Sequence, residues 1–94
     1  MTTSFESIWD RIGRHTGQIF HTMTGLPFTY RLASPRQLRV TRDGKEINRG
    51  LSYTNFEQAH ALMPASGPAE LKGSQGMAYT WAILMDRRIR QSDW

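Results

Sequence analysis

The 94-residue chain contains no cysteine. Disulfide bonds and thiolate metal sites are therefore excluded, and apolar packing has to stabilise the fold. The chain also has no stretch approaching the ~18 apolar residues of a membrane span, and its N-terminal segment has acidic residues early instead of the apolar run of a signal peptide. These absences predict a cytoplasmic protein without a membrane partner.

Motifs for metal and phosphate chemistry are missing as well. The three histidines, His15, His21 and His60, have neither HExxH spacing nor a cysteine or carboxylate arranged as a co-ligand. The sequence GSQG at 73–76 is too short to be read as a phosphate-binding loop. We therefore predict no metal site and no cofactor. His60 lies beside the apolar stripe of an expected helix, which favours a packing role.

Internal repeats, low-complexity tracts and linkers that would divide the chain are absent. A chain of this length can bury one core but not two. We expect residues 1–94 to form a single domain.

Positive charge is present, and it is concentrated in one segment. Residues 31–49 contain six basic and two acidic residues, an excess equal to the net charge of +4 of the whole chain. The sequence pI of about 10.1 favours an anionic partner such as nucleic acid. The six basic residues are Arg31, Arg36, Arg39, Arg42, Lys45 and Arg49.

The N-terminal segment has apolar residues at helical spacing. Thr3 and Glu6 form a capping-box pattern, and Gly13 suits the end of a short helix. The inward stripe is expected to be Phe5, Ile8, Trp9 and Ile12. The following segment, 17–25, is rich in threonine and β-formers, which favours a strand or an extended arm.

The segment 27–49 predicts an antiparallel β-meander. Apolar and polar residues alternate over 28–32 and 38–41, which is the period of a strand with one buried face. The Asp43-Gly44 pair is a hairpin signal that places Thr41 opposite Glu46. Three strands are expected, or four if 17–25 joins them. The outer face should present Thr29, Arg31, Arg39, Thr41, Glu46 and Asn48.

The C-terminal half predicts two helices. The first, within 51–64, could begin at Ser52 or at Thr54, because both are suitable N-caps. Its inward residues should be Phe56, Ala59, Leu62 and Met63. The loop 65–76 is long for so small a domain, which raises the chance of contact with a ligand or partner. Residues 77–91 favour a second, central helix, with a buried strand as the alternative.

These elements indicate an α+β fold with helices on one face of the sheet. The basic outer face then predicts nucleic-acid binding, with duplex DNA favoured over RNA, since a two-stranded ribbon fits the major groove and arginine binds phosphates. A second basic group lies near the C-terminus and would also stabilise the end of a helix. Its members are Arg87, Arg88 and Arg90.

Two other functions fit the same residues. The basic face could bind an acidic partner protein, as an inhibitor or adaptor would, and charge alone does not separate this from nucleic-acid binding. A small ribonuclease could use His21 or His15 as a general base, with arginines holding the phosphate. No catalytic motif accompanies either histidine, so an enzyme is the less favoured interpretation.

Overall fold

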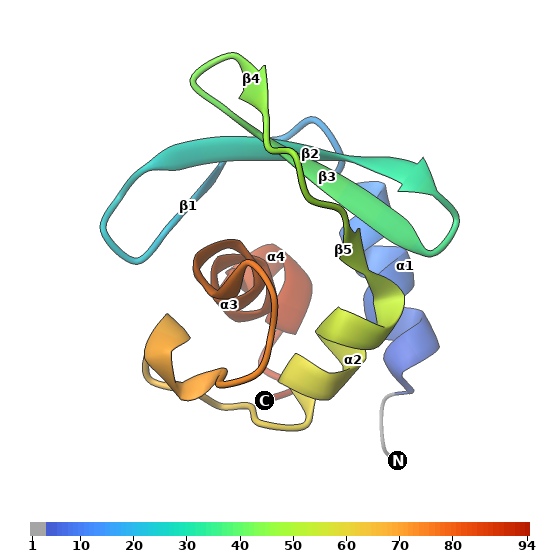
Figure 1. The fold of residues 1–94 in the computed structure, drawn as a ribbon. Helices are drawn as coiled ribbons and strands as arrows, with labels where there is room; N and C mark the ends of the chain where they lie inside the picture. The colour runs from blue at the N-terminus through green and yellow to red at the C-terminus, as the bar shows by residue number, and fades with distance from the viewer. Residues whose placement is uncertain (1–3) are drawn as a thin grey trace.

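The computed structural model describes residues 4–94, and in it a curved antiparallel sheet arches over a group of helices (Figure 1). The α+β class predicted from the sequence is confirmed. In chain order the elements are α1 (Phe5–Arg14), β1 (Phe20–His21), β2 (Pro27–Ser34), β3 (Gln37–Arg42), β4 (Lys45–Glu46), β5 (Leu51–Ser52), α2 (Tyr53–His60), the 3-10 helix η1 (Pro68–Glu70), α3 (Met77–Met85) and α4 (Arg87–Arg90).

Helix α1 buries the apolar stripe expected from its spacing. Its N-cap is Ser4, whose side chain accepts a hydrogen bond from the Ser7 backbone N–H. Thr3 of the predicted capping box lies outside the described residues. The helix continues through Gly13 to Arg14, so the predicted end was wrong. Burial of the apolar face against the sheet outweighs the helix-breaking tendency of one glycine.

The meander has the predicted register. Thr41 lies opposite Glu46, and Arg42 lies opposite Lys45. Between them, Asp43 and Gly44 both have positive φ angles, 55° and 75°, as a type I′ turn requires. Glycine adopts this conformation without strain, which explains the hairpin signal.

The sheet has more strands than the predicted meander. Strand β1 pairs with β2, which confirms a strand within 17–25, and β5 pairs with β3. Strands β4 and β5 thus share one edge of β3, and residues 47–50 connect them. The sequence did not predict β5, because its two residues directly precede α2 and carry no alternating pattern.

Helix α2 begins at the first of the two candidate caps. The Ser52 hydroxyl accepts a hydrogen bond from the Asn55 backbone N–H at 3.1 Å. Phe56 and Ala59 are fully buried as predicted, whereas Leu62 is 50% exposed. The helix ends at His60, so Leu62 lies beyond the helical spacing that would have turned it inward.

The C-terminal segment is helical and does not form the alternative buried strand. It contains two helices, however, where the sequence predicted one. Asp86 adopts an extended conformation between α3 and α4, and its carboxylate accepts a hydrogen bond from the Arg88 backbone N–H. Helix α3 crosses beneath the sheet and contributes Ala82, Ile83 and Leu84 to the core (Figure 1). The arginines that follow Asp86 therefore belong to a separate short helix.

Candidate nucleic-acid interface

The outer face of the sheet carries two of the predicted arginines, Arg31 and Arg39. They lie directly opposite each other on β2 and β3. Arg31 reaches across to Glu46 on β4 and donates hydrogen bonds of 2.8 and 3.0 Å to its two carboxylate oxygens. These hydrogen bonds lower the pKa of Glu46 and hold it charged. Much of the positive charge of this face is therefore neutralised within the protein.

Arg36 is turned away from the other cations. It lies in the turn between β2 and β3, forms an ion pair of 2.8 Å with Glu6 of α1 and stacks over the Tyr53 ring at 4.4 Å. These contacts join the turn to α1 and to the start of α2. Arg36 thus has an anionic and an aromatic partner inside the chain.

Arg42 lies at the end of β3, on the side that faces the helices. Its guanidinium donates a hydrogen bond of 3.2 Å to the hydroxyl of Tyr79 on α3 and lies 3.8 Å from the Asp43 carboxylate. Both Arg42 and Asp43 are exposed, so this long ion pair contributes little. The guanidinium keeps donors that are directed to solvent.

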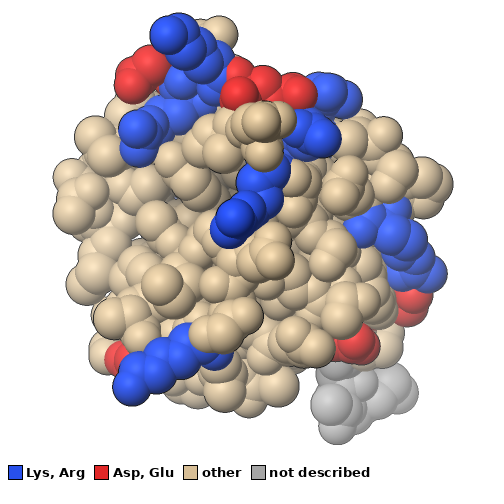
Figure 2. Space-filling view, viewed as in Figure 1, with Lys and Arg blue, Asp and Glu red and all other residues tan. Residues whose placement is uncertain are grey.

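Three other cations of the predicted site form no ion pair or side-chain hydrogen bond with any residue of 4–94: Arg39, Lys45 and Arg49. Together with Arg42 we call them the hairpin cations, although Arg49 lies just beyond the hairpin, in the segment that leads from β4 to β5. The β3–β4 hairpin projects from the body of the molecule (Figure 1), and basic side chains gather over it in the space-filling view, with acidic ones among them (Figure 2). Of the six predicted residues, Arg31 and Arg36 are therefore held by ion pairs within the chain, and the four hairpin cations can contact a partner.

The second basic cluster does not act as a unit. Arg88 donates hydrogen bonds to Asp86, to the Gln18 side chain and to the Ile19 backbone carbonyl, and its guanidinium stacks over Phe20 at 3.9 Å. It therefore fastens α4 to the strand β1. Burial opposes the charged form of Asp86, but the hydrogen bonds from Arg88 outweigh it and lower the pKa of Asp86.

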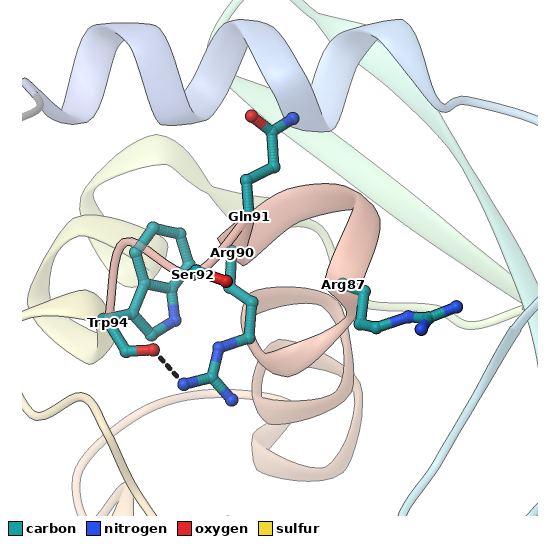
Figure 3. A pocket seen from close by; sticks show the side chains of 5 residues that line it. All are labelled: Arg87, Arg90, Gln91, Ser92 and Trp94. Atoms are coloured by element: carbon teal, nitrogen blue, oxygen red, sulfur yellow. Dashed lines mark hydrogen bonds between the residues drawn. The ribbon is translucent and has the colours of Figure 1, made fainter.

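The remaining members of that cluster, Arg87 and Arg90, line a hollow of about 570 Å³ near the C-terminal turn. Figure 3 shows Arg87 and Gln91 pointing in different directions, away from Trp94, while Arg90 donates a hydrogen bond to the Trp94 backbone oxygen. The polar groups do not converge on a common point. A ligand would meet one free guanidinium at this place, and we do not assign a site to it.

The histidines proposed for catalysis have no carboxylate partner within residues 4–94. His15 is the C-cap of α1, where its Nδ1 lies 3.3 Å from Oε1 of Gln18, and His21 is exposed on β1. Neither forms an ion pair with a carboxylate of the described chain. His60 packs between the rings of Phe5 and Trp94, and partial burial lowers its pKa. Its packing role agrees with the sequence interpretation.

The tryptophan side chains, which are of the type that stacks on unpaired bases, form hydrogen bonds within the protein. The indole N–H groups of Trp9, Trp81 and Trp94 donate to the backbone carbonyls of Pro35, Ala65 and Leu84. The residue that sequence reasoning missed is Tyr79, which joins α3 to the hairpin through Arg42. No local pattern signals this contact, because the two residues are 37 positions apart.

Comparisons with protein-family models, with curated proteins and with solved structures found no match to this chain. Within residues 4–94, no cluster of three histidine, aspartate or glutamate side chains is suited to hold a metal ion. The helices in that range are all too short or too polar to cross a bilayer. Function is therefore argued from the surface of the molecule.

Proposed function

We propose that this chain binds the phosphate backbone of nucleic acid, with duplex DNA favoured, through the hairpin cations. The observation that carries the proposal is their common position along the projecting β3–β4 hairpin and the segment that directly follows it, three of them without an ion pair in residues 4–94. A ribbon of this kind is narrow enough for the major groove, and guanidinium groups donate readily to phosphate oxygens.

The two faces of the ribbon support the same conclusion. Arg39 lies on the outer face of the sheet, whereas Arg42 extends toward the helices and contacts Tyr79. A ribbon inserted in a groove has a phosphate strand on either side of it. Cations on both faces can therefore meet both strands, and this arrangement favours a duplex over a single strand.

The test is the salt dependence of binding to a labelled duplex. If four cations meet phosphates, the logarithm of affinity should fall with the logarithm of salt concentration with a slope of about −4. The double variant Arg42→Ala/Lys45→Ala should flatten the slope by about 2. The matched control is Lys72→Ala/Arg87→Ala, which removes the same charge from exposed positions outside the hairpin and should leave the slope unchanged.

Two outcomes would reject the proposal. One is the absence of binding at ~50 mM salt, where nonspecific association with DNA is expected to be measurable. The other is an equal loss of slope in the hairpin variant and in the control, which would indicate attraction by net charge alone.

A second candidate is an interaction module for an acidic partner protein, and one observation favours it. Ile19, Met23 and Leu26, in the arm around β1, are 47 to 59% exposed. Ile19 shares a shallow depression with Asp43 and Gly44 at the hairpin tip, so an apolar surface borders the basic one. A partner with apolar residues beside acidic ones would fit both. If this candidate is correct, Met23→Ser should weaken partner binding and leave any duplex affinity unchanged.

A further inference from the structure

A small polar hollow is lined in part by Gly50, the residue that follows Arg49. It measures about 200 Å³ and is formed by the start of α2 and the loop before α3. Ligand sites for drug-sized molecules are usually about 300 Å³ or larger, so this hollow suits one small group. Its lining contains hydroxyl and amide side chains and glycines, without a charged residue.

The walls of the hollow are held by a hydrogen-bond network centred on Asn55. The Asn55 side chain donates to the Gln75 carbonyl and to the Thr80 hydroxyl, and it accepts from the Gln75 backbone N–H at 2.9 Å. Thr80 is fully buried and donates to the same carbonyl. The loop 73–76 is thereby fastened to α2 by hydrogen bonds within the chain.

The side chains that line the hollow and form no hydrogen bond with the described chain are suited to bind an uncharged polar ligand. Thr54, Gln58 and Gln75 have exposed side chains that form no hydrogen bond with residues 4–94. A glutamine amide offers both donors and acceptors, and a hydroxyl offers one of each. The edge of a nucleobase carries the same alternation of donors and acceptors.

One of the hairpin cations, Arg49, adjoins this hollow along the chain. Arg49 directly precedes Gly50, which lines the hollow, and it borders a small apolar depression with Gly76, which directly follows Gln75. A phosphate bound by Arg49 would therefore lie next to the unused amides. The chain thus places a phosphate-binding group beside a neutral hydrogen-bonding site.

We propose that this hollow binds the base of one unpaired nucleotide, with Gln58, Gln75 and Thr54 contacting the base edge and Arg49 contacting its phosphate. The inference rests on the proposed function, since nucleic acid bound to the hairpin brings the nucleotide to the hollow. It adds a preference for a duplex that carries a bulged or unpaired nucleotide over one that is fully paired.

The experiment compares two labelled duplexes of the same length, one fully paired and one with a single unpaired nucleotide. The protein should bind the second about tenfold more tightly, because two net hydrogen bonds are equivalent to about one order of magnitude in affinity. Gln58→Ala/Gln75→Ala should remove this preference and leave binding of the paired duplex unchanged. Arg42→Ala/Lys45→Ala should weaken both duplexes equally and keep the preference, which provides the matched control.

The outcomes separate the two proposals. Equal affinity for both duplexes in the unmodified protein would overturn the nucleotide site while leaving the hairpin interface intact. A preference that persists in the glutamine variant would also overturn it, because another part of the surface would then detect the unpaired nucleotide. Failure to bind either duplex at ~50 mM salt would reject the proposed function itself.

Discussion

Replacing Arg88 with alanine should destabilise the protein, because this member of the second basic cluster is held by contacts within the chain. The substitution removes a partly buried ion pair with Asp86, a hydrogen bond to the Ile19 carbonyl and the contact of the guanidinium with the Phe20 ring. Typical values are about 0.5 kcal/mol for such an ion pair, about 1 for the hydrogen bond and about 0.5–1 for the cation–π contact. The free energy of unfolding should therefore fall by about 2 kcal/mol.

Urea denaturation followed by tryptophan fluorescence measures this change. Arg87→Ala is the matched control, since Arg87 is the neighbouring residue, carries the same charge and is exposed. It should change stability by less than about 0.5 kcal/mol. In a thermal scan the Arg88 variant should melt roughly 8–16 °C lower than the unmodified protein, at about 4–8 °C per kcal/mol for a domain of this size.

The acid range provides a second readout for Arg88. Because Arg88 lowers the pKa of Asp86 below its ordinary value of 3.8, the folded state holds the aspartate charged more strongly than the unfolded state does. That part of the stability is present above the unfolded pKa and is lost as pH falls through the folded pKa. The difference in the free energy of unfolding between the unmodified protein and Arg88→Ala should thus become smaller in acid. Equal stability of the Arg87 and Arg88 variants at pH 7 would refute the structural role of Arg88.

Three further predictions test the packing. Val40→Asp should unfold the domain because Val40 is 1% exposed and faces the helices, whereas Arg39→Ala should be tolerated. Circular dichroism distinguishes these outcomes. An equal loss of folded structure in both variants would reverse the assignment of the sheet faces. Burial lowers the pKa of His60, so stability should decline as pH falls below its unfolded value of about 6.5, and melting temperatures of His60→Gln should lack that component. Gly76→Ala should lower the urea midpoint, because φ is +56° and a Cβ would lie 2.9 Å from a Leu51 methyl carbon; an unchanged midpoint would contradict this geometry.

Local chemistry in the sequence determined the elements whose signals lie within a few residues. The Asp43-Gly44 pair predicts the hairpin and its register, because a type I′ turn needs two positive φ angles. Alternation over β2 and β3 identifies most of the buried face, with Tyr30 and Val40 inside as expected, although Leu32 near the strand end is 39% exposed. The spacing of apolar residues in α1 likewise identifies its inward stripe.

Boundaries between elements were less predictable, since competing local signals differ by small energies. By sequence alone, Ser52 and Thr54 are equally suitable N-caps. In the structure, the pairing of β5 with β3 places Ser52 at the sheet edge, and Ser52 caps the helix. The break between α3 and α4 occurs at Asp86, where an N-cap interrupts a sequence that otherwise continues as a helix. Tertiary contacts decide such cases because they contribute more than the local preferences.

Whether each arginine is free to bind a phosphate depends entirely on the tertiary structure. Arg31 meets Glu46 across 15 residues of sequence, and Arg88 meets the Ile19 carbonyl across 69. Composition alone determined that the segment 31–49 is basic, and the turn and strand patterns determined that it forms a hairpin. Which cations remain free for a phosphate follows from the carboxylates, carbonyls and rings that folding brings beside them, because a guanidinium that is already paired within the chain has few donors left for a partner.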